Sequence, residues 1–73
     1  MTKEEWRKFK SSRFAAWYGL VPWTKFGNVN RTLCHKMGVS RQTIRNYYNG
    51  KTEIPEMALP IINEVAGADL FAQ

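Results

Sequence analysis

The sequence predicts a compact all-α domain of four to five helices, and three observations support this fold class. Apolar residues recur at helical spacing in several stretches of the chain, beginning with Trp6 and Phe9. Glycines and prolines that are typical helix stops and starts separate these stretches. Seventy-three residues with 44% hydrophobic and 14% aromatic content are enough for one small core, so residues 1–73 are expected to form a single domain.

The first helix is expected to run from Thr2 to Gly19. Thr2 and Glu5 have the spacing of a capping box, and Gly19 is a plausible stop. An inward stripe is formed by Trp6, Phe9, Ala16, Trp17 and Leu20, widened by Phe14 and Tyr18. The opposite face is expected to be a solvated surface; it holds Lys3, Arg7, Lys10 and Ser11.

Residues 20–30 break the helical pattern. Pro22, Gly27 and two asparagines predict a loop or a single turn. Trp23 and Phe26 are too apolar to remain in water, so we expect this loop to fold onto the domain. The alternative is an aromatic contact surface for a partner or for a second copy of the chain.

Two short helices joined by a tight turn are expected next. The second helix covers about residues 30–37, and Gly38 ends it in the left-handed conformation that permits a sharp turn. Ser40 is a good N-cap for a third helix over residues 41–49, which Gly50 stops. The side chains expected to face the core are Leu33, Met37, Ile44 and either Tyr47 or Tyr48.

A fourth helix is expected near the C-terminus. Pro60 lacks an amide proton and disfavours the helical conformation of the residue before it. The regular helix is therefore expected to start only at Leu59 or Pro60, with residues 55–58 as a looser turn. In the tail, Leu70 and Phe71 must pack on the body of the domain or on another subunit.

Charge is distributed unevenly along the chain. All eleven Lys and Arg residues lie within residues 3–51, where only Glu4 and Glu5 oppose them. Residues 52–73 hold four acidic residues and no basic one. A basic body with an acidic tail fits a nucleic-acid binder whose last segment faces away from phosphate. An uneven distribution of ordinary surface charge is the alternative.

The third helix carries a polar stripe that contains no acid. The residues on its outer side are Arg41, Gln42, Arg45, Asn46 and Asn49. Arginine pairs with two acceptors of guanine, and glutamine or asparagine pairs with adenine, in the major groove of DNA. A plain solvated helix usually mixes in acidic residues, but none occurs between Glu5 and Glu53. The stripe therefore favours DNA recognition over an ordinary polar face.

Residues 32–50 resemble the helix-turn-helix of the Cro/C1-type, lambda-repressor-like regulators. The matching positions are Leu33, Cys34 in the small-residue position, Met37, Gly38, Val39, Ser40, Thr43, Ile44, Tyr47, Asn49 and Gly50, followed by Lys51 and Pro55. The resemblance implies a lambda-repressor-like domain with a helix-turn-helix core at about residues 31–50. The chain departs from the family in Tyr48, in Pro60 and in the ten or so residues expected between its first two helices.

The resemblance also implies roles for individual residues. Arg41 and Gln42 would reach base edges, with Asn46 one turn further on, and Arg45 would read a base or hold a phosphate. Phosphates would be held by Ser40, Asn49, Lys51 and the backbone amides of Arg31 and Thr32, expected at the N-terminus of the second helix.

These observations lead to an expected function. The chain is expected to bind double-stranded DNA and to regulate transcription, as a repressor that occupies an operator, in the manner of a small phage or mobile-element regulator. A homodimer on an inverted repeat is expected, with residues 20–29 or the Leu70–Phe71 tail as the dimer surface. The competing hypothesis is a protein-interaction module or inhibitor that uses the aromatic loop 20–29 on the same scaffold.

Other kinds of site are not expected. A zinc site needs about four ligands, and Cys34 and His35 are the only cysteine and histidine of the chain. No glycine-rich phosphate loop, carboxylate pair or nucleophile motif is present, so we expect no enzyme activity, metal, cofactor or small-molecule ligand. No secretory signal or long apolar run occurs, which predicts a cytoplasmic protein without a membrane partner.

Overall fold

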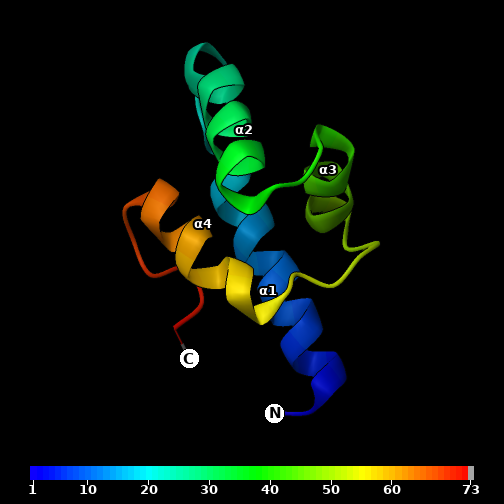
Figure 1. Cartoon of the computed structure of the whole chain (residues 1–73). Coiled ribbons are helices and arrows are strands. Elements are labelled where there is room, and N and C mark those ends of the chain that lie inside the picture. The colour runs from blue at the N-terminus through cyan, green and yellow to red at the C-terminus, as the bar shows by residue number, and fades with distance from the viewer. Residues whose placement is uncertain (73) are drawn as a thin grey trace.

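The N-terminal helix begins at the predicted capping box. The computed structural model describes residues 1–72, and its first helix is α1 (Lys3–Tyr18) (Figure 1). The Thr2 hydroxyl accepts a hydrogen bond from the Glu5 amide, and the Glu5 carboxylate accepts one from the Thr2 amide. Two of the free amides at the helix start are thereby satisfied. Gly19 follows the helix, so both predicted ends of α1 are confirmed.

The second helix, α2 (Trp23–Met37), begins seven residues earlier than expected. The prediction of a loop over residues 20–30 was wrong, because only residues 19–22 link α1 to α2. Pro22 caps the helix start, where the missing amide proton of proline is not needed. The expected long connection between the first two helices, which departed from the family pattern, is therefore absent.

The tight turn after α2 and the helix that follows it form at the predicted residues. Gly38 has φ 68° and ψ 34°, and its amide donates to the carbonyl oxygen of Cys34. This left-handed conformation costs a residue with a Cβ atom about 1–2 kcal/mol, which explains the glycine. The third helix, α3 (Arg41–Asn49), starts at Ser40, whose hydroxyl accepts a hydrogen bond from the Thr43 amide.

The C-terminal segment forms a short 3-10 turn followed by a helix. The turn η1 (Glu56–Ala58) leads directly into α4 (Leu59–Ala66), as Pro60 predicted. Asn63 then holds the tail, because its side-chain oxygen accepts a hydrogen bond from the Leu70 amide at 2.9 Å. Phe71 is only 6% exposed and packs in the core of its own chain, so it is not free to form a dimer surface.

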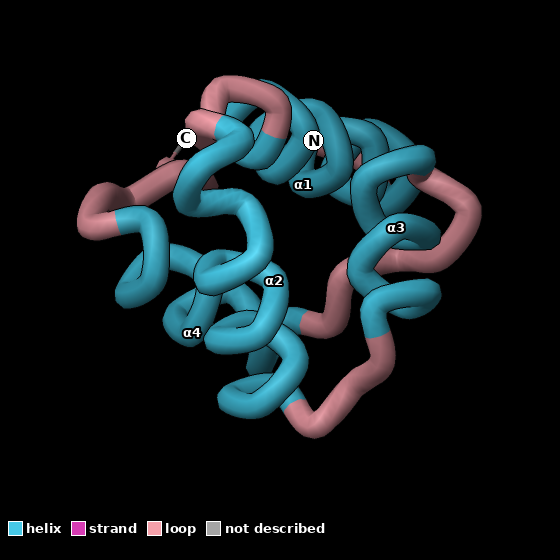
Figure 2. Tube along the Cα trace, turned by 90° about the horizontal axis from the view of Figure 1, so that it is seen from above, coloured by secondary structure: helices cyan, strands magenta, loops and turns pink. Residues whose placement is uncertain are grey.

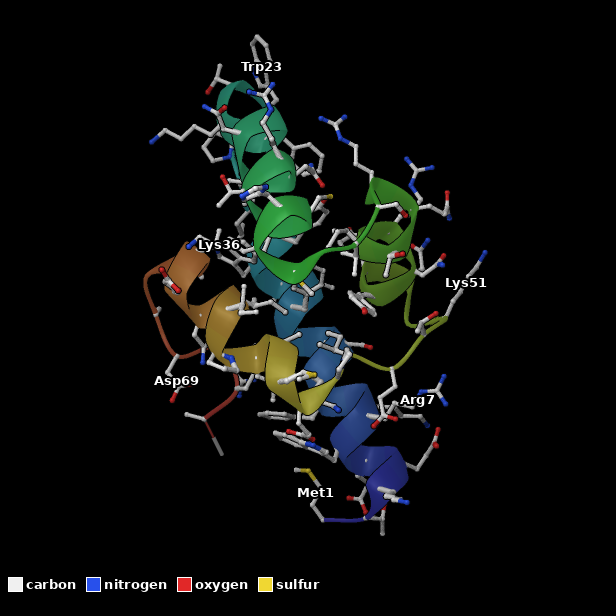
Figure 3. All side chains as sticks on the ribbon, viewed as in Figure 1. Met1, Arg7, Trp23, Lys36, Lys51 and Asp69 are labelled. Carbon is white, nitrogen blue, oxygen red and sulfur yellow. The ribbon has the colours of Figure 1, made fainter. Side chains whose placement is uncertain are left out.

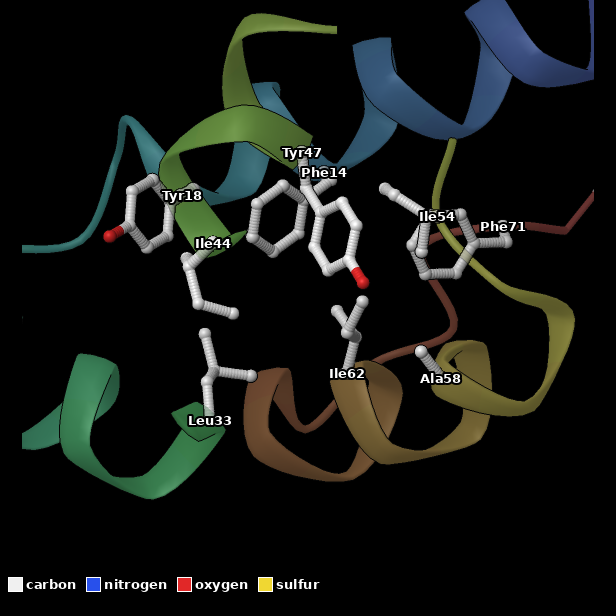
Figure 4. Close-up of a cluster of buried hydrophobic side chains, with 9 residues drawn as sticks. All are labelled: Phe14, Tyr18, Leu33, Ile44, Tyr47, Ile54, Ala58, Ile62 and Phe71. Carbon is white, nitrogen blue, oxygen red and sulfur yellow. The ribbon is translucent and has the colours of Figure 1, made fainter. Parts of the chain in front are cut away.

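The core lies where the four helices meet. α3 packs against α1, and α2 packs against both α3 and α4 (Figures 1 and 2). The Cα radius of gyration is 11.5 Å, close to the roughly 11 Å expected for a compact chain of this length. The buried apolar side chains in Figure 4 are Phe14, Tyr18, Leu33, Ile44, Tyr47, Ile54, Ala58, Ile62 and Phe71.

Lys10 is the one predicted surface cation that lies in the interior. Its side chain is 1% exposed, and its Nζ donates to the carbonyl oxygen of Ile54 at 2.7 Å. Nζ also lies 3.2 Å from Glu53 and 3.4 Å from Glu56, two exposed carboxylates. The expectation of a solvated Lys10 was wrong, because this ammonium joins α1 to the segment that follows α3.

Candidate nucleic-acid interface

The outer face of α3 is formed as the sequence predicted. Arg41, Gln42, Arg45 and Asn49 are exposed, and Asn46 is half-buried. The inner face carries Ile44 at 0% and Tyr47 at 4% exposure, so Tyr47 rather than Tyr48 is the buried tyrosine. Because the core holds the inner face, the outer polar side chains stand on a fixed helix.

Two amide side chains on this face are already paired with each other. The Gln42 side-chain nitrogen donates to the Asn46 side-chain oxygen at 3.1 Å, one helical turn apart. This bond leaves the Gln42 oxygen as an acceptor and the Asn46 nitrogen as a donor. An acceptor beside a donor is the pattern that complements the N6 and N7 edge of adenine.

The cations of this face are not neutralised within the described chain. Among residues 1–72, Lys10 and Lys36 are the basic residues with carboxylate partners. Arg41, Arg45 and Lys51 are exposed, and Figure 3 shows Lys51 directed away from the body just beyond α3. The face therefore retains the positive charge that attraction to phosphate requires.

The residues predicted to hold phosphates lie in different parts of the structure. Asn49 and Lys51 lie exposed at the end of α3, and Ser40 lies exposed at its start. The Ser40 hydroxyl also lies 3.2 Å from the Thr43 hydroxyl, so it already makes contacts within the cap. These three residues flank the candidate base-reading residues on both ends of the helix.

Arg31 and Thr32 do not lie at a helix N-terminus. They are in the interior of α2 (Trp23–Met37), where backbone amides bond within the helix. Their amides are therefore not free to hold a phosphate, and this part of the prediction was wrong. Thr32 borders the groove between α2 and α4 together with Glu64, whereas the Arg31 side chain is exposed.

Large apolar side chains remain in solvent near the start of α2. Trp23 is 87% exposed and Leu20 is 82% exposed, while Phe26 is 38% exposed. Phe26 packs on Tyr18, with their ring centroids 4.9 Å apart. The expectation that this segment folds onto the domain therefore holds for Phe26 and was wrong for Trp23, which Figure 3 shows at the far tip of α2.

A cleft of about 410 Å³ lies between the α1–α2 link and α3. Its walls include the rings of Tyr18, Phe26 and Tyr48, and its lining also includes Arg41 and Arg45. The sequence did not predict this cleft, because it predicts a loop over residues 20–30, where the structure has the first turns of α2. The spacing of Trp23, Phe26 and Asn30, at i, i+3 and i+7, was the available signal for a helical face there.

A buried polar pair fixes one side of the cleft. The Tyr18 hydroxyl donates to the side-chain oxygen of Asn30, which is 4% exposed, and the Asn30 nitrogen donates to the Phe26 carbonyl at 3.0 Å. Burial raises the pKa of the Tyr18 hydroxyl above 10.0, and the hydrogen bond to Asn30 opposes that shift. Tyr18 is therefore a neutral donor at physiological pH.

Within residues 1–72, no three His, Cys, Asp or Glu side chains lie together in an arrangement that could hold a metal ion. None of the helices in this part of the chain combines the length and the apolar character that crossing a bilayer demands.

The fold and this face define a small all-helical domain that presents a basic, amide-rich helix. Comparisons of the chain with protein-family models, with curated proteins and with solved structures found no match.

Proposed function

We propose that this chain is a sequence-specific, double-stranded DNA-binding regulator of the Cro/C1 type, with α3 as its recognition helix. The observation that carries the proposal is the outer face of α3. That face combines two guanidinium groups without carboxylate partners in the described chain and a prearranged pair of amides. The groups match the acceptor-rich base edges of the major groove.

The proposed contacts divide into two kinds. Arg41, Gln42, Arg45 and Asn46 read bases, and each good pair contributes about 1–3 kcal/mol of discrimination against the wrong base. Ser40, Asn49 and Lys51 hold phosphates at the two ends of α3, and the Arg31 side chain is a further candidate. Phosphate contacts set the register of the protein on the duplex without selecting the sequence.

The proposed mode of action is repression by operator occupancy in the cytoplasm of a bacterium or a phage-infected cell. A single domain covers one half-site, so two copies are expected on an inverted repeat with recognition helices about 34 Å apart. Since Phe71 belongs to the core, the remaining candidate dimer surface contains Leu20 and Trp23. Sedimentation of the Leu20→Ser, Trp23→Ser double variant tests this surface: a dimer that persists unchanged contradicts it.

A DNA titration tests the function directly. Fluorescence anisotropy is measured with the duplex upstream of the gene for this chain and with a random-sequence duplex of equal length. We expect tighter binding to the upstream duplex, and a slope of log affinity against log salt of about −0.9 for each phosphate contacted. The variant Arg41→Ala, Gln42→Ala is expected to lose about 10- to 100-fold in affinity and most of its site preference.

A matched control removes one cation and one polar side chain elsewhere. Lys8 and Ser12 are exposed on α1, so the variant Lys8→Ala, Ser12→Ala carries the same change in charge without touching α3. It is expected to retain the site preference. The proposal fails if neither duplex is bound at about 50 mM salt. It also fails if both double variants behave like the parent chain.

One observation favours a second candidate function. Trp23 and Leu20, three positions apart near the start of α2, expose most of their surface, and clustered exposed apolar side chains are typical of protein contact sites. A protein-interaction module or inhibitor that uses this segment is therefore the alternative. The same titration separates the two, because such a module shows no salt-dependent binding to either duplex.

A further inference from the structure

The cleft beside α3 has aromatic walls that the proposed DNA contacts do not use. The Tyr18 ring lies 4.9 Å from the Phe26 ring and 5.4 Å from the Tyr48 ring, measured between centroids. The three rings come from α1, α2 and α3 and border one opening. The volume of about 410 Å³ lies within the roughly 300–1,000 Å³ typical of small-molecule sites.

The inner side of the cleft is already ordered. Asn30 is 4% exposed, and its side chain joins the Tyr18 hydroxyl to the Phe26 carbonyl. These bonds hold a ring from α1 and the backbone of α2 in fixed positions. A ligand that enters the cleft therefore meets a prearranged surface and loses little free energy in ordering it.

The outer part of the cleft is positively charged. Arg41 and Arg45 line it together with the amide of Gln42, and no carboxylate is among its lining residues. Guanidinium groups form short, bidentate hydrogen bonds with carboxylates and phosphates. Flat aromatic walls beside two guanidinium groups therefore select a flat ring with a negative charge at one end.

We infer that this cleft binds a small planar aromatic ligand that carries one anionic group. The ring lies against Tyr18, Phe26 and Tyr48, and the anion pairs with Arg41 and Arg45. An aromatic carboxylate and a mononucleotide both have this chemistry. Because the two arginines also belong to the proposed base-reading face, the bound ligand competes with DNA; this competition rests on the proposed function, whereas ligand binding itself does not.

Calorimetric titration without DNA tests the binding. The probes are indole-3-acetate with its neutral counterpart indole-3-acetamide, and adenosine monophosphate with neutral adenosine. We expect at least one anion to bind with a Kd of about 1 mM or lower. Its neutral counterpart is expected to bind about tenfold more weakly, since it lacks the charge-assisted hydrogen bonds. The anion that binds shows whether the ligand is an aromatic carboxylate or a mononucleotide.

Matched variants locate the site. Arg41→Ala, Arg45→Ala is expected to weaken anion binding about tenfold or more. Lys3→Ala, Lys8→Ala removes the same charge from exposed positions on α1 and is expected to leave binding unchanged. Phe26→Ala removes one wall at a partly exposed position, so the fold is retained and both the anion and its neutral counterpart bind more weakly.

Three results would overturn the inference. These are no binding of either anion at about 5 mM, equal binding of the neutral counterparts, or equal loss in the two double variants. A chain that binds the ligand but no duplex contradicts the proposed function and leaves the cleft intact. A chain that binds a duplex but no ligand contradicts the inference about the cleft and leaves the proposed function intact. Simultaneous binding of ligand and duplex contradicts the competition between them.

Discussion

The two halves of α2 differ in what holds them. The C-terminal half carries Leu33, which is fully buried, and ends at the Gly38 turn. The N-terminal half carries Trp23, which is 87% exposed, and Gly27, near which a Cβ atom would meet nothing within 4 Å. Figure 1 shows these first turns extending beyond α4. The packed half, residues 31–37, is thus fixed by the core, and the extended half, residues 23–30, extends from it.

Stability and recognition are therefore assigned to different parts of α2 in this small domain. The packed half supports the turn that positions α3, so a change there alters the whole fold. The extended half contributes Phe26 and Asn30 to the cleft and is held by the Tyr18–Asn30 hydrogen bond. Substitutions in the two halves should therefore change the free energy of unfolding by different amounts. At one position the change should have the opposite sign.

The largest contrast is expected between Leu33→Ala and Trp23→Ala. Loss of the buried Leu33 side chain should lower the free energy of unfolding by about 2–5 kcal/mol, through lost burial and the cavity left behind. Loss of the exposed Trp23 side chain should change it by about 0.5 kcal/mol or less. Urea unfolding followed by circular dichroism measures both, and equal effects would show that the two halves are packed alike.

The next largest effect on stability is expected from loss of the hydrogen bond between Tyr18 and Asn30. Tyr18→Phe leaves the buried Asn30 oxygen without its donor, which should cost about 1–3 kcal/mol of stability. Tyr48→Phe is the matched control, because Tyr48 is 41% exposed, and it should cost about 0.5 kcal/mol or less. Equal values for both variants in thermal unfolding would rule out the pair as the support of the extended half.

Alanine in place of the glycine inside α2 and alanine in place of the glycine in the turn after it should change the free energy of unfolding in opposite directions. Gly38→Ala should destabilise by about 1–2 kcal/mol, because alanine is strained at φ 68°. Gly27→Ala should stabilise by about 0.5–1 kcal/mol, because Gly27 lies inside a helix with open space around it. Urea midpoints at neutral pH measure both changes. A neutral or destabilising Gly27→Ala would mean that residues 23–30 are not a stable helix.

The smallest effect on stability is expected from ionisation of Tyr18 in alkaline solution. Burial raises the pKa of Tyr18 in the folded chain, so the unfolded chain loses this proton first as the pH rises. The resulting contribution to stability is complete below pH 10.0 and is lost as the pH rises through the raised pKa. Urea midpoints measured from neutral to alkaline pH should therefore fall more in the parent chain than in Tyr18→Phe, and parallel curves would contradict this.

Much of the chain that follows the packed half of α2 could be predicted from the sequence because its signals are local. The Gly38 turn, the Ser40 cap and the alternation of Ile44 and Tyr47 with polar residues each depend on a few neighbouring positions. Pro60 likewise predicted the positions of η1 and α4 correctly. The outer face of α3 could also be predicted, because the helical period determines which side chains share a face once the two ends of the helix are known.

The extended half could not be predicted in the same way. Gly27 and two asparagines favour a loop when they are judged by local propensity, and tertiary contacts outweigh that preference. The contact that stabilises the helix there joins Asn30 to Tyr18 on another element, and no local pattern records such a pairing. The cleft depends on the same contact, so it was missed together with the helix. Lys10 was misplaced for a similar reason, because its partners lie more than 40 positions away.

The burial of Lys10 has a consequence for chemical labelling. Reagents that acylate amines need an accessible, deprotonated Nζ, but in the folded chain this atom is enclosed and donates to the Ile54 carbonyl. Lys8, two positions away, is exposed and should react readily. The extent of acylation at Lys10 relative to Lys8, read by mass spectrometry, therefore reports how often the contact between α1 and residues 53–56 opens. A single peptide from α1 would carry both the measurement and its internal standard.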